Sequence, residues 1–391
     1  MMPNRFLMLA LVVSLGAGRC AAASRHPAAP VVRLGLTVSA NGVVLWEGRP
    51  YRGIGVNYFS AFYWTLLAPG DTSYEAGFRT LHGLGIPFCR LMGGGFWPKE
   101  RRLYRDNPHE FFRRLDAVVR SAERNHVGLI PSLFWNKFAV PDLVGEPMSA
   151  WADPKSRTRA YMRDYVRDMV GRYRHSPAIW GWEFGNEFNL SADLPNAAEH
   201  RPQIVPALGT PATRSAKDEV TYEDIRAAFA AFAREVRRYD PDRLISTGDG
   251  FPRESAWHNW KEKTWTADTP AQAAQMLRAD NPAPVDVLSV HAYRDCAASL
   301  RADALLGRQW GKPLFVGEFG APGPSEKSEA GFQALLKAIQ DADVPLAALW
   351  VYDFSNQDAD FNVTAANGRA YQLRAIADAN ARLRAQMPGR P

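Results

Sequence analysis

Short apolar or β-rich runs alternate with longer amphipathic segments along most of this 391-residue chain. The short runs have the length of buried strands, whereas the segments between them repeat apolar residues at helical spacing. The strand-like runs cover residues 51–57, 86–91, 128–134, 178–185, 243–247, 285–291, 313–318 and 346–351. Eight strand–helix units in a row predict the α/β class and a single (β/α)8 barrel, which typically needs about 250 residues and grows by lengthening its loops.

Capping residues predict where several helices begin. One amphipathic segment carries an apolar stripe over residues 111–122, with Phe111 and Leu115 four residues apart. Three further starts are predicted at Asp153-Pro154, at Thr221 with Asp224 three residues later, and at Thr269-Pro270. The last helix is predicted to cover roughly 370–386.

Two features extend the barrel beyond its minimal form. Residues 36–39 and 43–46 flank Asn41-Gly42, which is a strong signal for a two-residue β-hairpin, and we expect this hairpin to cover the barrel floor. The segments 189–220 and 248–268 are long, polar and rich in Pro, so we expect functional βα loops on the carboxyl-terminal face.

The first residues predict a targeting segment. Arg5 precedes an apolar run over 6–15, and Ala21-Ala22-Ala23 provides small residues for cleavage. We therefore predict a signal peptide at 1–23, a short linker at 24–35, a catalytic domain at 36–391, and a secreted or periplasmic protein with no membrane span after cleavage. A lipid anchor on Cys20 is the alternative, but Arg19 occupies a position where such a signal requires a small residue.

Charge and composition exclude several classes of function. With 47 Lys+Arg against 41 Asp+Glu the net charge is +6, and the basic residues are spread over amphipathic helices, which argues against nucleic-acid binding. The eight His are scattered without a metal-binding motif, so neither a metal nor another cofactor is expected. Cys89 and Cys296 are predicted to be two separate buried thiols rather than one bridge. We expect a monomer.

Two predicted strands end on a carboxylate. The fourth closes with Asn186-Glu187 and the seventh with Glu318. Because the carboxyl ends of barrel strands meet on one face, these side chains are candidates for a pair across a central pocket. Glu183 lies deeper in the fourth strand and is predicted to be a hydrogen-bonded interior carboxylate rather than a catalytic one.

The residues at the strand ends together resemble a known enzyme family. They are Arg90 on the second strand, Asn186-Glu187 on the fourth, His291 and Tyr293 after the sixth, Glu318 on the seventh and Trp350 on the eighth. This ordered set is similar to glycoside hydrolase family 5, a group of clan A barrel hydrolases that includes endo-β-mannanases and cellulases. The resemblance implies a retaining hydrolase of a β-linked polysaccharide or oligosaccharide that works by double displacement.

The resemblance also implies a role for each carboxylate. Glycoside hydrolysis passes through an oxocarbenium-like transition state, so the leaving oxygen needs a proton and the anomeric carbon needs a nucleophile. Glu187 would be the acid/base and Glu318 the nucleophile. The resemblance places Arg90 and Tyr293 among the substrate-binding residues and implies that they keep Glu318 ionised, whereas Glu187 has no such partner in the sequence and is expected to keep its proton.

Further residues are expected to contact the sugar. Asn186 offers an amide to the 2-hydroxyl, His291 would line the reacting subsite and Trp350 would form its floor. Pyranose rings stack on aromatic side chains, so Trp97 and Trp135 are predicted to bind substrate too. Seven Trp follow strand ends, at 64, 97, 135, 257, 260, 265 and 350, and we expect at least half of the 12 Trp around the cleft.

The chain departs from many members of the family at two places. Phe188 follows the Asn-Glu pair where many relatives have Pro, and Phe134-Trp135-Asn136 ends the third strand where many carry His. These departures leave the substrate open. We expect an endo-β-1,4-mannanase first, and a β-1,4-glucanase or an exo-β-glycosidase as alternatives. The non-enzymatic alternative is an inactive carbohydrate-binding barrel that uses the same aromatic cleft.

Overall fold

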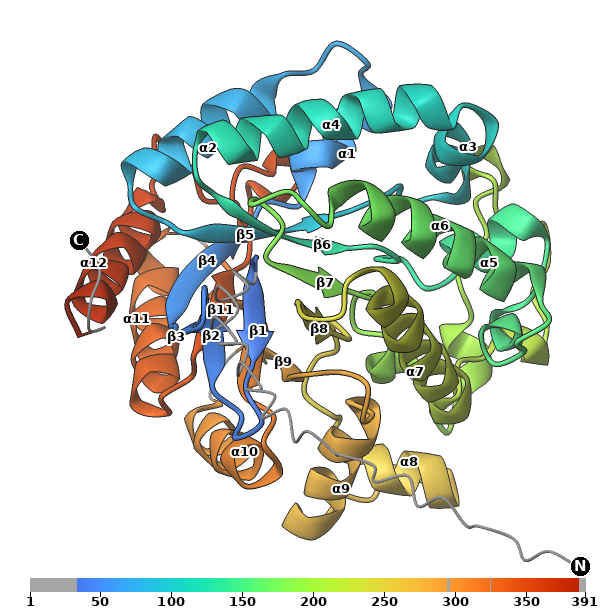
Figure 1. Ribbon diagram of the computed structural model, residues 1–391. Helices are drawn as coiled ribbons and strands as arrows, with labels where there is room; N and C mark the ends of the chain where they lie inside the picture. Colours follow the sequence, from blue (N-terminus) through green and yellow to red (C-terminus); the bar gives the residue numbers. More distant parts are fainter. Residues whose placement is uncertain (1–33, 294–295, 324, 387–391) are drawn as a thin grey trace, which may run out of the picture. The chain divides into compact units, whose positions relative to one another are not determined.

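The computed structural model describes residues 34–293, 296–323 and 325–386 (Figure 1). The predicted signal peptide at 1–23, with Cys20, and residues 24–33 of the predicted linker lie outside this part of the chain. None of the described helices has the length and apolar character that crossing a membrane requires.

Eight parallel strands form the predicted barrel. They are β4 (Gly53–Asn57), β5 (Phe88–Met92), β6 (Gly128–Ser132), β7 (Gly181–Glu183), β8 (Leu244–Ser246), β9 (Leu288–Tyr293), β10 (Leu314–Gly320) and β11 (Leu346–Leu349). Their order in the sheet is β8-β7-β6-β5-β4-β11-β10-β9, and the end strands meet where the amide of Asp286 donates to the carbonyl of Ile245 at 3.0 Å. The expected (β/α)8 architecture is therefore confirmed.

Helices surround this sheet (Figure 1). The α-helices are α1 (Ser60–Leu67), α2 (Ser73–Gly83), α3 (Pro98–Asp106), α4 (Pro108–Arg124), α5 (Ala139–Val144), α6 (Arg157–Tyr173), α7 (Tyr222–Tyr239), α8 (Ala256–Glu262), α9 (Pro270–Asp280), α10 (Ala297–Trp310), α11 (Ser325–Asp341) and α12 (Ala370–Gln386). Short 3-10 helices lie in the loops at Met148–Trp151, Asn189–Ser191, Ala197–His200, Pro206–Leu208, Ala216–Asp218 and Ser355–Gln357. The two long predicted loops, 189–220 and 248–268, are thus built from single turns and the short helix α8.

Local capping explains where the helices begin. The side chain of Thr221 accepts a hydrogen bond from the amide of Asp224, and that of Thr269 from the amide of Gln272, so both predicted starts are confirmed. The predicted start at Asp153-Pro154 is wrong. Asp153 instead closes a turn by accepting from the amide of Lys155 at 2.8 Å, and α6 begins three residues later, where Ser156 is the cap.

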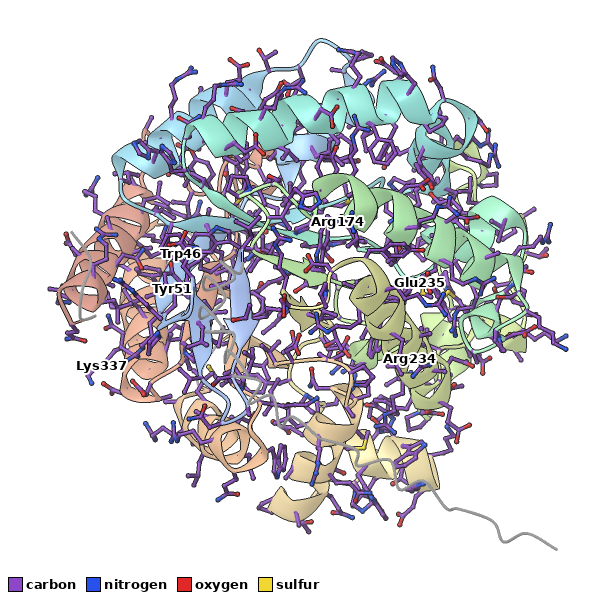
Figure 2. All side chains as sticks on the ribbon, in the orientation of Figure 1. Trp46, Tyr51, Arg174, Arg234, Glu235 and Lys337 are labelled. Carbon is purple, nitrogen blue, oxygen red and sulfur yellow. The ribbon has the colours of Figure 1, made fainter. Side chains whose placement is uncertain are left out.

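The barrel floor is covered by the predicted hairpin, β1 (Leu36–Val38) and β2 (Val44–Trp46), to which the short strand β3 (Arg49–Pro50) adds a third strand. The hairpin is tied to the barrel where the amide of Leu36 donates to the carbonyl of Trp180 at 2.7 Å, just before β7. Leu36 and Tyr51 pack in one buried cluster with Trp180 and with residues at the start of the barrel strands. Figure 2 labels Trp46, at the end of the hairpin, and Tyr51, and the centroids of their rings are 6.4 Å apart.

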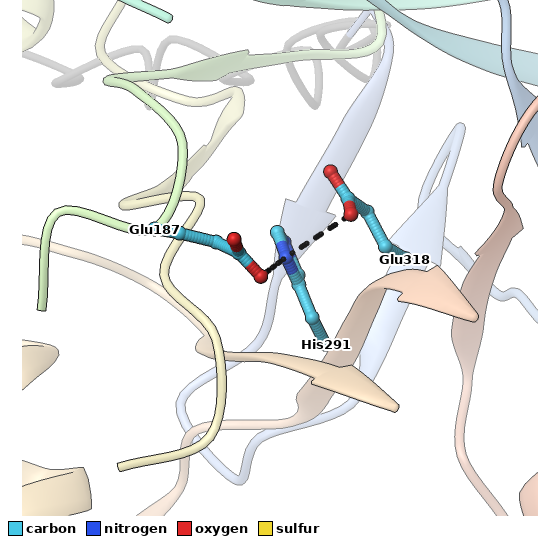
Figure 3. A group of neighbouring side chains, drawn as sticks. All are labelled: Glu187, His291 and Glu318. Carbon is cyan, nitrogen blue, oxygen red and sulfur yellow. Dashed lines mark hydrogen bonds and ion pairs between the residues drawn. The ribbon is translucent and has the colours of Figure 1, made fainter. Parts of the chain in front are cut away.

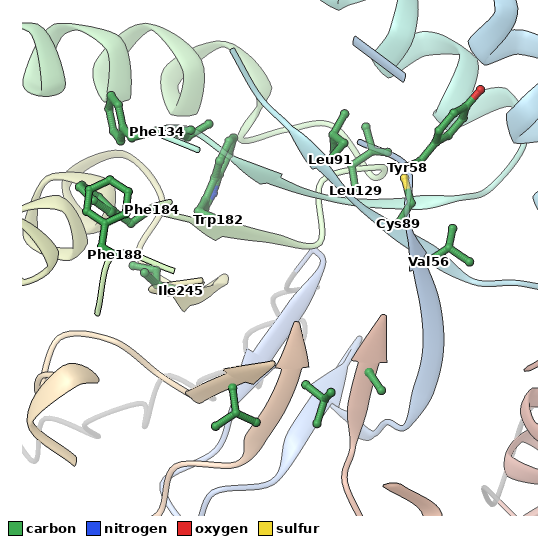
Figure 4. Packing of buried hydrophobic residues seen from close by; sticks show 14 of the residues in the cluster. Val56, Tyr58, Cys89, Leu91, Leu129, Phe134, Trp182, Phe184, Phe188 and Ile245 are labelled. Carbon is green, nitrogen blue, oxygen red and sulfur yellow. The ribbon is translucent and has the colours of Figure 1, made fainter. Parts of the chain in front are cut away.

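The main core lies between the barrel and its helices (Figure 4). Alternate strand residues point outward into it, for example Val56, Leu91, Leu129 and Ile245, all buried. Cys89 is a buried thiol that forms no disulfide in the described part of the chain, so the prediction that it is not bridged to Cys296 is confirmed. The outward strand positions therefore hold apolar residues of the core, and only the inward positions at the strand ends can place side chains in a site.

The corrected start of α6 gives a stability prediction. Ser156 is buried, accepts from the amide of Arg159 at 3.0 Å and donates to the carbonyl of Ala150 at 2.8 Å. Ser156→Ala should therefore lower the free energy of unfolding by about 1 to 2 kcal/mol. Asp153→Ala is the matched control and should change it by less than about 0.5 kcal/mol. Urea denaturation of the two variants measures the difference, and equal effects would contradict the assignment of Ser156 as the cap.

Candidate active site

A pocket of about 780 Å³ opens at the carboxyl ends of the barrel strands. Seven of the predicted site residues line it: Trp97, Trp135, Asn186, Glu187, Tyr293, Glu318 and Trp350. Tyr63 and Phe96, which come after predicted strands, also line it, and the prediction missed three further aromatic side chains in its wall, Phe59, Phe354 and Phe361. The pocket has the size and the largely aromatic lining of a small-molecule site.

The expected gathering of Trp residues around the cleft is wrong in number. Three of the 12 Trp line the pocket, namely Trp97, Trp135 and Trp350. Trp260 instead packs on the core and lies under the guanidinium of Arg226, 4.7 Å from its ring centroid. Trp265 is half exposed. Phenylalanine and tyrosine provide most of the remaining aromatic wall.

Arg90 on β5 lies behind the pocket and is completely buried. Its Nε donates to Glu183 at 2.6 Å, its Nη1 to Glu318 at 2.7 Å, and its Nη2 to Oδ1 of Asn186 at 2.7 Å. Burial by itself would lower the pKa of Arg90, but the charges of Glu183 and Glu318 outweigh it and raise that pKa. Arg90 was predicted to bind substrate, whereas its contacts are with the carboxylates and not with the pocket space.

Glu318 receives a donor on each carboxylate oxygen. Arg90 occupies Oε1, and the hydroxyl of Tyr293 donates to Oε2 at 2.6 Å. Burial and the charge of Glu318 raise the pKa of Tyr293 well above its ordinary value, so its phenol remains a donor across the working range of pH. These two contacts match the sequence expectation that Arg90 and Tyr293 both face Glu318.

A β-bulge turns Glu318 toward the barrel axis. The register between β9 and β10 shifts between Val316 and Glu318, so Gly317 is an extra residue in the strand. Val316 points outward into the main core, and without the bulge Glu318 would share its side. Gly317 also leaves space for His291, because a Cβ there would lie 3.0 Å from the imidazole Nε2.

Glu187 follows β7 and projects into the pocket with about a third of its side chain exposed. Its backbone is left-handed, with φ of 50°, a conformation that is unfavourable by roughly 1–3 kcal/mol for a residue with a side chain. The amide of Glu187 donates to the carbonyl of Gly248 at 2.9 Å. Gly248 has φ of 78°, and a Cβ there would lie 2.0 Å from the carbonyl oxygen of Gly185. The close contact between these two backbones fixes where Glu187 emerges.

His291 lies between the two carboxylates (Figure 3). Its Nδ1 is 2.9 Å from Glu187 Oε1 and 3.4 Å from Glu318 Oε2, and its side chain is 1% exposed. It therefore contacts the carboxylates instead of lining the sugar subsite as predicted. Burial alone would raise the pKa of Glu187, but the hydrogen bond and charge of His291, with Lys137 and Arg90, lower it below the ordinary value. This differs from the expectation that Glu187 keeps its proton.

The spacing of these three groups is short. One ligand atom from each of Glu187, His291 and Glu318 lies within 4.8 Å of the other two. The two carboxylates therefore face one another across a gap that fits a single reacting centre.

Sequence reasoning missed several residues that hold the site. Asn57 at the end of β4 accepts from Arg90 at 3.0 Å and donates to the carbonyl of Gly317 at 2.9 Å. Ser246 on β8 donates to Glu183 at 3.1 Å, which agrees with the prediction that Glu183 is a hydrogen-bonded interior carboxylate. Polar residues at strand ends were a usable signal for Asn57 and Ser246, since each closes a buried strand.

Comparison with known families gives the assignment. The family model described as Cellulase (glycosyl hydrolase family 5) matches residues 107–356, which is more than half of the chain. The chain belongs to glycosyl hydrolase family 5. As a member, it is a glycoside hydrolase, in agreement with the resemblance seen in the sequence.

Individual relatives of this family 5 hydrolase match it either over a short segment or at low sequence identity. It is 37% identical over 81 residues to mannan endo-1,4-β-mannosidase A of Podospora anserina, a segment that covers 19% of this chain and only 21% of that relative. The endo-1,4-β-mannanase of Rhizomucor miehei has 17% identity and a TM-score of 0.66, over 89% of this chain and 99% of that one. An exo-β-1,4-mannosidase of Opitutaceae bacterium strain TAV5 has 17% identity and a TM-score of 0.56, over 89% of this chain and 63% of that one. At this identity the solved structures establish the barrel fold alone.

The contact of His291 with Glu187 predicts a change in titration. Removing the imidazole in His291→Asn removes the largest influence that lowers the pKa of Glu187, so this pKa should rise and the carboxylic acid should persist to higher pH. Carbon-13 NMR of labelled glutamate side chains measures it. His258→Asn is the matched control, because His258 pairs with Asp268 at 2.7 Å and is absent from the pocket lining. An unchanged or lower Glu187 pKa in His291→Asn would contradict the assigned contact.

Proposed function

We propose that Glu187 and Glu318 are the catalytic pair of a retaining β-glycoside hydrolase that works by double displacement. The observation that carries this proposal is the spacing of the two carboxylates, whose facing oxygens lie within 4.8 Å. Retaining enzymes place their carboxyl groups about 5–5.5 Å apart, whereas inverting enzymes need about 6.5–9.5 Å to admit a water molecule.

In the first step Glu318 attacks the anomeric carbon and forms the glycosyl-enzyme. The bond from that carbon to the leaving oxygen breaks, and Glu187 gives this oxygen a proton. Arg90 and Tyr293 hold the carboxylate of Glu318 in one orientation before attack, since each of its oxygens accepts from one of them. This fixed geometry lowers the entropic barrier to attack.

In the second step Glu187 takes a proton from water, which attacks the anomeric carbon and releases Glu318. The first step requires Glu187 to be protonated although His291 lowers its pKa in the free site. A bound sugar covers the exposed third of the Glu187 side chain, and the added desolvation favours the neutral acid. The value of kcat/KM should accordingly fall as pH rises through the pKa of Glu187 in the free enzyme, which lies below its ordinary value.

Asn186 is proposed to bind the 2-hydroxyl of the reacting sugar. Its Oδ1 accepts from Arg90, which orients the side chain and leaves the amide Nδ2 as the group offered to the ligand. Trp135 and Trp350 are nearly parallel, with an angle of 26° between their planes, and are proposed to provide the apolar surface below the sugar.

We propose β-1,4-mannan as the first substrate and endo cleavage as the mode. The mannan endo-1,4-β-mannosidase from Podospora anserina and the mannanase from Rhizomucor miehei support this choice. Exo action on a β-mannoside is the second candidate, supported by the exo-β-1,4-mannosidase among the structural neighbours. We further propose export with removal of residues 1–23, which N-terminal sequencing of protein recovered outside the cytoplasm tests.

The two catalytic roles predict different products in the presence of azide. Glu187→Ala should lose about 10²–10⁴-fold in kcat/KM on polysaccharide, retain more activity on aryl β-glycosides with good leaving groups, and yield β-glycosyl azide. Glu318→Ala should be inactive alone and yield the α-glycosyl azide. Glu199→Ala, an exposed residue of the loop after β7, is the control. NMR of the products identifies the anomer of each azide. An α-glycosyl azide from Glu187→Ala together with a β-glycosyl azide from Glu318→Ala would reverse the assigned roles.

Substrate choice is tested with a panel of mannan, glucomannan, cellulose derivatives and aryl β-mannosides. An endo-mannanase should lower the viscosity of mannan early, with few reducing ends released, and should give products of the β anomer. Mannose as the first product would indicate exo action instead. Absence of cleavage of every substrate would overturn the proposal.

A further inference from the structure

A second, smaller cavity lies against the catalytic pocket and shares two of its residues, Phe96 and Trp97. We call it the side pocket; its volume is about 270 Å³, and it is bounded by Phe96, Trp97, Asn136, Lys137, Arg201 and Arg253. This is slightly below the range of about 300–1,000 Å³ found for drug-sized ligands, which suits a single sugar unit. Because both pockets share the Trp97 wall, one branched ligand can occupy both.

The lining of the side pocket is basic. Lys137, Arg201 and Arg253 all border it, whereas none of the described residues that line it is Asp or Glu. Arg201 is paired with Glu219, so its charge is partly neutralised. Lys137 and Arg253 are close enough for Arg253 to disfavour the charged form of Lys137. Two cations brought together in this way create a positive potential in the cavity.

Arg253 is held in place by the backbone. Its Nε donates to the carbonyl of Leu190 at 2.6 Å, which leaves the terminal nitrogens of the guanidinium for other contacts. Burial has the largest effect on Lys137 and lowers its pKa to about 8, although the charges of Glu187 and Asp249 raise this pKa and the charge of Arg253 lowers it further. Lys137 therefore remains mostly protonated at neutral pH.

Asn136 supplies an independent indication of a ligand. It lines the side pocket, its side chain is 7% exposed, and its Nδ2 has no hydrogen-bond partner among the described residues. A buried amide donor without a partner is unfavourable by about 1–3 kcal/mol. Because the Nδ2 atom itself has almost no accessible surface, the amide must rotate toward the side pocket before an acceptor oxygen there relieves this penalty.

We propose that the side pocket binds the carboxylate of an acidic sugar branch, so that the substrate is a β-linked glycan carrying uronic-acid side groups. Arg253 pairs with the carboxylate, Asn136 donates to one of its oxygens or to a ring hydroxyl, and Trp97 stacks on the sugar ring. The aromatic wall favours a sugar over an inorganic anion. This inference rests on the proposed glycosidase function and extends it to a substrate class.

The kinetic test compares one β-1,4-linked oligosaccharide with and without a glucuronosyl branch. Wild type should have the higher kcat/KM on the branched substrate. Arg253→Gln should lose about tenfold or more of kcat/KM on that substrate and less than about twofold on the unbranched one. Arg382→Gln, the same charge change at an exposed position of α12, should alter neither. Equal losses on both substrates, or no preference in wild type, would overturn the proposal.

A binding test separates this inference from the catalytic proposal. Methyl β-glucuronide should quench tryptophan fluorescence of the inactive Glu318→Gln variant, and it should bind at least about tenfold more tightly than methyl β-glucoside. The difference should disappear in Glu318→Gln/Arg253→Gln and weaken at high ionic strength. Binding without any hydrolysis would sustain the side pocket while the catalytic proposal fails. Equal affinity for the two sugars, or displacement by an equal concentration of inorganic sulfate, would overturn the assignment.

Discussion

The buried ion pairs of Arg90 are the interaction on which the site depends. A guanidinium without water is tolerated only if its donors are satisfied, and here they reach Glu183, Asn186 and Glu318. These partners come from β7, the segment just after it, and β10, while Arg90 itself lies on β5. The contacts that join these strands therefore also position Glu318 directly, and they hold Asn186, the residue next to Glu187. Loss of one partner would leave a buried charge uncompensated, which destabilises proteins by about 3–5 kcal/mol.

The two carboxylates differ because their surroundings differ. Glu318 is nearly buried and accepts from a permanent cation and a phenol. Glu187 is a third exposed, and its main partner is an imidazole that Glu318 also faces. The environment of Glu187 therefore changes when substrate displaces solvent, whereas that of Glu318 is set by the folded protein. The proposed role of Glu187, which is both to give and to take a proton, benefits from such a variable environment.

The barrel and the two carboxylates at its strand ends could be predicted from the sequence, because a charged residue at the end of a buried apolar run is conspicuous. It was insufficient where a side chain depends on a local irregularity. Strict alternation from Val316 would direct Glu318 toward the helices, and only the extra residue at Gly317 reverses this. A position after a strand also does not determine where a long loop carries its side chains, as Trp260 shows. Asp153-Pro154 has the residues of a helix start, but Ser156 is the residue that caps α6.

The hairpin on the barrel floor limits the direction from which a chain of sugars can reach the site. Leu36 and Tyr51 pack against the start of the strands, and the barrel interior above them is filled with side chains. A chain of sugars therefore has no passage along the barrel axis. It must lie sideways across the open rim, and both cleavage products must depart by the face through which the polymer arrived.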